Sequence, residues 1–217
     1  VRIYNRALDA SEVASLAAGN PSTGSGVYSL GSALAVSGDL SLISGELRSG
    51  NAYGVTVSGS WINGGGVLTS TGTVTLDNTG NQSISGSTVF NNLTVTRTAA
   101  STLTFDHKSR QSVSGTLTMA GAASNLLSLR SSLSGSASNL LLDASSGTQA
   151  IGYVDVQDSD ATGGKLLTAG DNATDSGNNT NWEFTKTYSI TGTAYSDEGS
   201  TALASKNISV SANGGSV

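Results

Sequence analysis

The stretch from Gly66 to Val95 reads Gly-Val-Leu-Thr-Ser-Thr-Gly-Thr-Val-Thr-Leu-Asp-Asn-Thr-Gly-Asn-Gln-Ser-Ile-Ser-Gly-Ser-Thr-Val-Phe-Asn-Asn-Leu-Thr-Val. Val74 and Leu76 alternate with threonines, and Leu93 and Val95 do the same further on. This period of two is that of a β-strand with one apolar and one hydroxyl-rich face. The residues in between, Asp-Asn-Thr-Gly-Asn and Asn-Asn, favour turns. The stretch therefore predicts short strands joined by tight turns.

A Val/Ile-Ser-Gly tripeptide recurs around this stretch. It begins at Val36, Val57, Ile84 and Val113, so the steps are 57 − 36 = 21, 84 − 57 = 27 and 113 − 84 = 29 residues. A further apolar-polar strand pattern follows most of these tripeptides, and the glycine lets the backbone bend at a corner. Irregular periods of roughly 20 to 30 residues indicate a β-solenoid whose turns vary in length.

We therefore predict an all-β chain whose residues 27–184 form a right-handed parallel β-solenoid (β-helix). Its core would be a stack of Val, Leu and Ile from successive coils. Tandem antiparallel β-sandwiches are the alternative, because short strands with turn signals suit them too. The direction of strand pairing distinguishes the two folds.

Several segments of this region resemble the right-handed β-helix repeats of large bacterial surface proteins. They are Gly72–Leu76, Asn81–Gly86, Phe90–Val95 and Val154–Ser159, and Asn178–Trp182 resembles the end of such an array. The resemblance covers more than half the chain and implies an architecture without specifying an activity.

The first residues have a different pattern. Val1–Tyr4 alternates as a strand, and Asp9 and Glu12 have the spacing of a capping box, which predicts one short helix over Ser11–Leu16. Residues 1–17 resemble the closing segment of a laminin-G-like, concanavalin-type jelly-roll domain. The resemblance implies that the rest of a jelly roll, with its glycan and calcium sites, precedes Val1. Residues 18–26 have linker composition, with the only proline, and predict a boundary.

The last residues change character again. Tyr188–Tyr195 and Asn207–Ser211 read as strands around a turn at Asp197–Gly199. Residues 185–217 resemble the start of a β-sandwich of the carboxypeptidase-regulatory or immunoglobulin-like kind. Because the chain starts with Val1 instead of Met, we expect it to be an internal piece of a longer protein.

The composition narrows the function class. Charged residues are only 12% of the 217, about half the usual share. A net charge of −5 argues against a nucleic-acid partner, which requires clustered Lys and Arg. The absence of cysteine removes disulfides and thiolate sites. We expect no membrane insertion, since no apolar run approaches the roughly 20 residues that cross a bilayer.

Four carboxylates form the only candidate calcium site. Asp158 and Asp160 begin a sequence resembling a calcium loop, and Asp171 and Asp175 follow soon after. Thr162 and Ala169 stand where an EF-hand requires ligand side chains. The alternative is that Asp and Gly mark turns at the corners of the coils. We therefore predict no cofactor, with Ca²⁺ as the one ion worth testing.

Catalytic residues are not predicted. His107 is the only histidine and lies in a predicted turn. The only cluster resembling a β-helix glycosidase or lyase site is Asp155, Asp158, Asp160 and Lys165, at one strand end and its turn. A catalytic groove would use carboxylates on successive coils.

Four aromatic residues are candidates for stacking on sugars: Tyr53, Trp61, Tyr153 and Trp182. Scattered aromatic residues more often belong to a core. Trp61 shares the inward parity of Val55 and Val57, which predicts a buried ring stacked on the neighbouring coil. In the run from Ile151, Val154 and Val156 are predicted to face one side and Tyr153 the other.

These observations predict a non-catalytic structural or adhesive spacer in a large secreted or cell-surface bacterial protein. A glycan-binding module is the alternative, and a polysaccharide-degrading β-helix enzyme is less favoured. Partners would be a surface polysaccharide or a ligand on a host or neighbouring cell.

Overall fold

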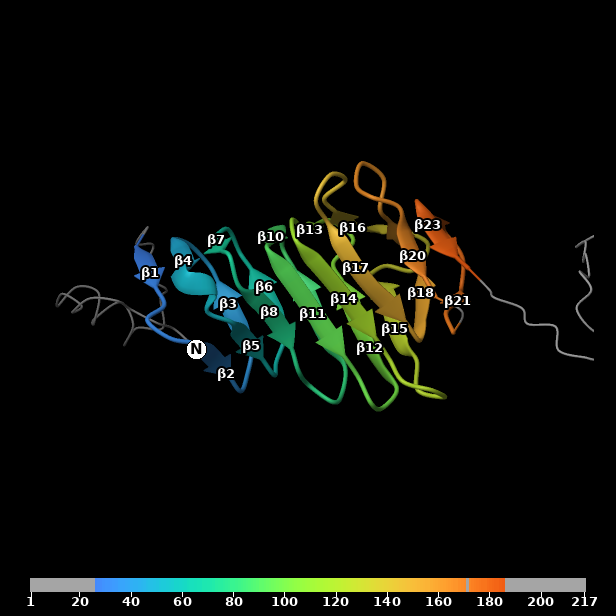
Figure 1. Cartoon of the computed structure of the whole chain (residues 1–217), viewed down its shortest axis with the longest axis horizontal. Helices are drawn as coiled ribbons and strands as arrows, with labels where there is room; N and C mark the ends of the chain where they lie inside the picture. Colours follow the sequence, from blue (N-terminus) through green and yellow to red (C-terminus); the bar gives the residue numbers. More distant parts are fainter. Residues whose placement is uncertain (1–25, 171, 186–217) are drawn as a thin grey trace, which may run out of the picture. The chain divides into compact units, whose positions relative to one another are not determined.

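The computed structural model describes residues 26–170 and 172–185 (Figure 1). This part contains 23 strands, one 3₁₀ turn at Gly50–Ala52 and no α-helix. The predicted helix and jelly-roll segment of residues 1–17, most of the predicted linker, and residues 186–217 of the predicted sandwich lie outside the described residues.

The strands form three faces that are visited in turn by every coil. The first face holds β1 (Val27–Ser29), β4 (Glu46–Ser49), β7 (Val67–Ser70), β10 (Thr88–Phe90), β13 (Arg110–Val113), β16 (Ser138–Leu142), β19 (Ser159–Asp160) and β22 (Asn179–Thr180). The second face holds β2 (Leu34–Val36), β5 (Val55–Val57), β8 (Thr73–Leu76), β11 (Asn92–Thr96), β14 (Thr116–Ala120), β17 (Thr148–Gly152), β20 (Leu167–Ala169) and β23 (Trp182–Phe184). The third face holds β3 (Leu40–Leu42), β6 (Trp61–Asn63), β9 (Gln82–Ser85), β12 (Ser101–Phe105), β15 (Leu127–Ser131), β18 (Val154–Gln157) and β21 (Thr174–Asp175).

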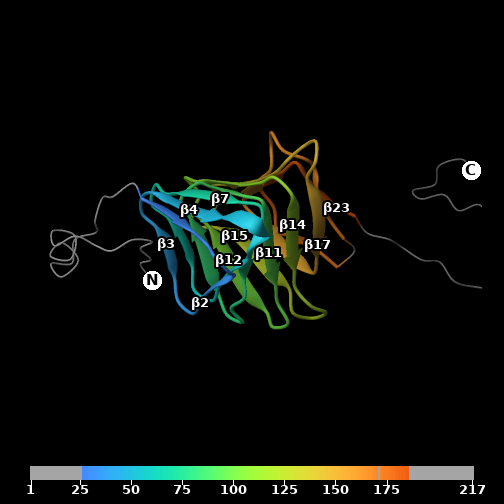
Figure 2. The ribbon, with the colours of Figure 1, turned by 60° about the vertical axis from the view of Figure 1, so that its left-hand side comes forward.

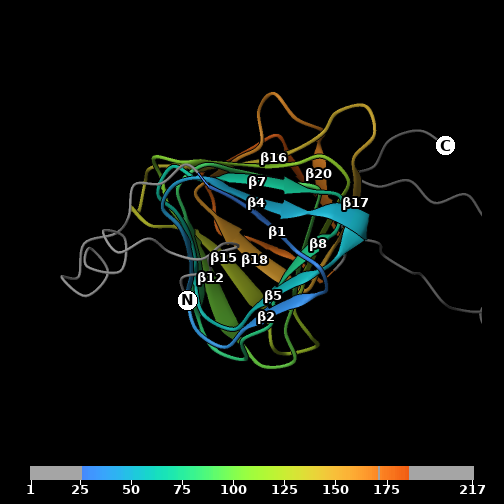
Figure 3. The same cartoon turned by 90° about the vertical axis from the view of Figure 1, so that its left-hand side faces the viewer.

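Neighbouring strands on each face are parallel. Hydrogen-bonded pairs join strands three positions apart, as in β5–β8–β11–β14, except between β7 and β10 and between β17 and β20. Along the first face β7 lies beside β10, and along the second β17 lies beside β20. The second face is at the front in Figure 1, and Figure 2 shows the faces as separate layers. In Figure 3, which looks along the stack, the three faces surround the core. The prediction of an all-β parallel solenoid is confirmed, and antiparallel sandwiches are excluded for the described residues.

The coils differ in length because their corners differ. On the second face Val55 pairs with Leu34, 55 − 34 = 21 residues earlier, and Val74 with Val55, 74 − 55 = 19 residues earlier. Leu117 follows its partner Leu93 by 117 − 93 = 24 residues. The predicted irregularity is confirmed.

The Val/Ile-Ser-Gly tripeptide, however, does not mark the same point in each coil. It ends β2 and β5 on the second face, but β9 on the third and β13 on the first. The tripeptide therefore indicates the end of a strand at a corner, and it occurs at all three kinds of corner.

The core is built from columns of inward side chains in register. One column on the second face runs Val36, Val57, Leu76, Val95 and Met119, each between 0 and 3% exposed. Outward residues of the same strands are mostly threonines, such as those of β8. Each coil thus buries its apolar face only by stacking on the next.

Trp61 is the largest buried side chain, and the prediction from its parity is confirmed. It is paired with Leu40 on one side and Ile84 on the other, and its exposed fraction is 0%. Its ring centroid lies 5.2 Å from that of Phe90. Its indole Nε1 donates to the hydroxyl of Thr88 at 3.0 Å. The ring therefore belongs to the core and offers no surface to a ligand.

A buried polar group crosses three coils at the corner between the second and third faces. Gln82 Nε2 donates to the carbonyls of Val57 at 3.0 Å and Gly59 at 2.5 Å. The guanidinium of Arg97, only 3% exposed, donates to the Gln82 amide oxygen and, at 2.7 Å, to the Leu76 carbonyl. Burial lowers the pKa of Arg97, and the charge of Asp77 opposes that shift. These bonds tie the corner residues of three successive coils together.

Gly86 shows why one corner requires glycine. Its φ is +71°, and a Cβ there would lie 1.7 Å from the carbonyl oxygen of Asn63 on the preceding coil. Close stacking and the left-handed conformation both exclude a side chain.

Candidate functional site

The candidate calcium ligands close turns. Asp158 is a corner residue between β18 and β19, with φ +57° and 4% exposure. Its carboxylate accepts from Asn178 Nδ2 at 2.5 Å and from the Gly135 amide at 3.0 Å, and these donors lower its pKa. The Asp160 carboxylate accepts from the Thr162 amide at 2.8 Å.

Asp175 has a similar local role. Its carboxylate accepts from the amide of Gly177 at 2.9 Å and from Asn179 Nδ2 at 2.6 Å. Asp171 lies outside the described residues. Within the residues that the structure describes, no group of three or more His, Asp or Glu side chains is placed to hold a metal ion.

The residues considered for catalysis interact with different partners. On the third face, Asp155 forms an ion pair with Arg130 and accepts from the Ser176 hydroxyl at 2.6 Å. Lys165 Nζ, in the loop between β19 and β20, donates to the Gly147 carbonyl at 2.8 Å. His107, in the turn between β12 and β13, has its Nδ1 3.0 Å from the hydroxyl of Ser132. These interactions tie one coil to the next.

Three of the four aromatic candidates pack within the stack. Trp61 is fully buried, and Tyr53 packs partly buried against the core. Trp182 stacks on Phe184 with centroids 6.0 Å apart, and its Nε1 donates to Ser159 Oγ at 3.1 Å. The fourth, Tyr153, lines a surface hollow.

Unequal corner lengths create this hollow. Residues 121–126 join β14 to β15, Tyr153 alone joins β17 to β18, and residues 170–173 join β20 to β21. These three connections occupy the same corner of successive coils. A one-residue corner between two longer ones leaves a recess.

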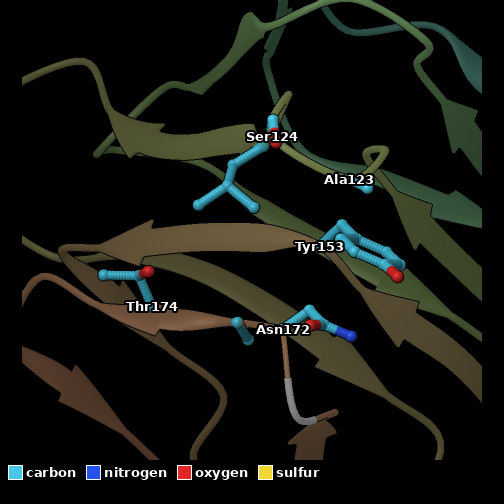
Figure 4. Close-up of a pocket in the computed structure, with 7 residues that line it drawn as sticks. Ala123, Ser124, Tyr153, Asn172 and Thr174 are labelled. Carbon is cyan, nitrogen blue, oxygen red and sulfur yellow. The ribbon is translucent and has the colours of Figure 1, made fainter.

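We call this recess the Tyr153 hollow. It has a volume of about 460 Å³ and is lined by Ala123, Ser124, Leu126, Tyr153, Asn172, Ala173 and Thr174. Figure 4 shows the side chains of Ala123, Tyr153 and Asn172 projecting in the same direction from the three neighbouring corners. None of the lining residues carries a charge.

The backbone of Tyr153 is in the left-handed region, with φ +52°. The alternation that predicted it as an outward strand residue is therefore wrong: β17 ends at Gly152 and β18 begins at Val154. Two other one-residue corners share this conformation, Asp158 at φ +57° and Asn181 at φ +58°. Asp and Asn suit it, whereas a bulky aromatic residue is uncommon there.

Sequence reasoning named Tyr153 and missed the remaining lining residues. The signal that could have found them is the change in spacing between apolar strands around residues 121–126 and 170–173. That spacing becomes informative only when the three corners are known to be neighbours.

No helix among the described residues is long and apolar enough to cross a membrane. Comparison of the chain with protein-family models, with curated proteins and with solved structures finds no match.

Proposed function

We propose that the chain is a non-catalytic structural and adhesive spacer of a large bacterial protein at the cell surface or outside the cell. The observation that carries this proposal is the parallel stack of the described residues. Its third face is one continuous seven-stranded sheet from β3 to β21, and on the other two faces separate sheets lie side by side at β7–β10 and β17–β20. A spacer has to transmit force and keep its length, and a solenoid does so because parallel strand pairs join each coil to the next on at least two faces.

The length of the stack follows from its strands. The first face holds a sheet of three strands and a sheet of five, adjacent through β7 and β10. Eight strands about 4.8 Å apart span roughly 34 Å. Each further coil of this kind adds about 4.8 Å of length and requires roughly 20 to 30 residues.

Side-chain amides at the corners strengthen the contact between coils. Asn63 Nδ2 donates to the carbonyl of Ser87 at 2.8 Å, and Asn78 Nδ2 to that of Ser58 at 2.8 Å. Asn91 and Asn179 make equivalent bonds to the carbonyls of Thr71 and Val156 at 2.9 Å each. Such bonds add side-chain hydrogen bonds between coils to those of the strand ladders.

Mechanical unfolding of single molecules held at both ends tests the proposal. A spacer should resist extension and then lose length in discrete steps of about one coil or a few coils. Extension at low force without steps, as in a flexible linker, would contradict it.

The less favoured enzymatic alternative is tested separately. Alanine variants of Asp155, Asp158, Asp160 and His107 should leave any turnover of pectin or another polysaccharide unchanged. A turnover that one of them abolishes would assign catalysis to the segment. The glycan-binding alternative has one specific observation in its favour, the Tyr153 hollow.

A further inference from the structure

We infer that the Tyr153 hollow binds a single uncharged sugar residue of a polysaccharide, with the phenol ring of Tyr153 as the stacking surface. This inference concerns the side of the stack and does not depend on its role as a spacer. It rests on the residue type at one corner, the chemistry of the lining and the rigidity of the walls.

The residue type is the first argument. At two other one-residue corners of the described chain, the residue at positive φ is Asp158 or Asn181, and both residue types suit that conformation. Tyr153 does not, yet it occupies such a corner and lines a recess. Backbone strain of this kind tends to accompany a functional site, where the side chain is needed for something other than folding.

The lining chemistry is the second argument. Within the described part of the chain, the side chains of Ser124, Tyr153, Asn172 and Thr174 make no hydrogen bond. The lining thus combines an aromatic ring, an amide and two hydroxyls, the groups that pair with the CH face and the hydroxyl groups of a pyranose. Because the lining is uncharged, it offers no counter-charge to a phosphate or a uronate.

The volume and walls are the third argument. The hollow is open to solvent, and its volume of about 460 Å³ leaves room for one sugar ring. One wall is a tight hairpin in which Ala122 and Asn125 exchange two backbone hydrogen bonds of 2.9 Å. The amide of Leu127 donates to the Tyr153 carbonyl at 3.0 Å, which fixes the corner against that wall. This wall and the Tyr153 corner are therefore fixed without a ligand, which lowers the cost of binding.

The test uses the whole 217-residue chain and four hexasaccharides. Three are neutral, built of glucose with α-links, glucose with β-links and mannose, and the fourth is hexagalacturonate. Binding is measured by saturation-transfer NMR and titration calorimetry. The wild-type chain should bind at least one neutral hexasaccharide and show no preference for the acidic one.

Tyr153→Asn removes the ring and keeps a residue that tolerates the corner, as Asn181 does. We expect at least a tenfold loss of affinity together with an unchanged or higher Tm, so that unfolding does not explain the loss. Tyr53→Asn is the matched control outside the hollow and should bind like wild type, and Asn172→Ala should weaken binding several-fold.

Three results would overturn the inference: no binding of any neutral hexasaccharide, binding that survives Tyr153→Asn, or selective binding of hexagalacturonate. The spacer proposal is tested separately by force measurements, so the sugar-binding inference and the spacer proposal can fail independently.

Discussion

Truncation of Trp61 to alanine should be among the most damaging single changes in the solenoid. The side chain is 0% exposed and lies between Leu40 and Ile84, so no neighbour in the packed column can easily fill the space. Removing a large buried aromatic residue costs about 3–5 kcal/mol through lost transfer energy and the cavity left behind. The Thr88 hydroxyl also loses its donor from the indole, although Asn63 Nδ2 remains 3.3 Å away. We expect a loss of about 4 kcal/mol in the free energy of unfolding.

The assay is equilibrium urea unfolding followed by far-ultraviolet circular dichroism, which does not depend on tryptophan fluorescence. Ile62→Ala is the matched control, because Ile62 is the next residue of the same strand and is only partly buried. It should cost about 1 kcal/mol or less. Trp61→Phe keeps a ring and should cost about 1–2 kcal/mol. A loss below about 1 kcal/mol for Trp61→Ala, or an equal loss for Ile62→Ala, would refute the stacked-core reasoning.

Three further predictions concern the corners. Gly86→Ala should lower the free energy of unfolding by at least about 2 kcal/mol, because its φ of +71° and the Asn63 carbonyl, 1.7 Å from the position of a Cβ, both oppose a side chain. The control Gly80→Ala should change the stability little, because the nearest atom to its Cβ would be 3.6 Å away. Similar losses for the two variants in denaturant melts would contradict this. Arg97→Met should lower the free energy of unfolding by about 2 kcal/mol, because the buried Gln82 amide oxygen loses its donor. In a double-mutant cycle with Gln82→Leu, the two losses should be clearly non-additive. Additive losses would show that the two side chains act independently. The Asn178 and Gly135 donors lower the pKa of Asp158 in the folded state. Its contribution to stability is therefore present above the unfolded-state pKa of about 4 and is lost as the pH falls through the lower folded-state pKa. The free energy of unfolding, measured from pH 7 to 2, should fall less steeply for Asp158→Asn than for the wild type, and parallel curves would refute this role.

Strand identity could be predicted because the core follows parity. Val74, Leu76, Leu93 and Val95 alternate with threonines, and a parallel stack buries one parity on every coil. The same argument placed Trp61 inside. Once each coil must bury its apolar side on its neighbour, the inward set follows from the alternation alone.

Corners could not be predicted in the same way. The Val/Ile-Ser-Gly tripeptides occur at all three kinds of corner. The number of residues between two tripeptides therefore does not equal the length of one coil. Tyr153 followed a strand parity in the sequence, yet the chain turns there through a single residue at positive φ. Turn geometry at such a point depends on the coils above and below it, which a local pattern does not contain.

The Tyr153 hollow illustrates the same limit. It exists because a one-residue corner lies between corners 121–126 and 170–173, which are far apart in sequence. Each connection alone looks like an ordinary turn.

If the coils stack in register, the distance between two spin labels on the same face is fixed by the number of coils between them. The chain has no cysteine, so Ala35→Cys and Ala150→Cys introduce two unique sites, both exposed on the second face. Register connects them through Thr56, Thr75, Thr94 and Thr118, which makes five steps between coils.

Five steps of about 4.8 Å predict a backbone separation of about 24 Å with a narrow distribution. Duplicating residues 73–91, one full coil by the pairing of Asn92 with Thr73, should lengthen the distance by about 4.8 Å without broadening it. A broad distribution, or a distance that the inserted coil leaves unchanged, would contradict the stacked solenoid on which the account rests.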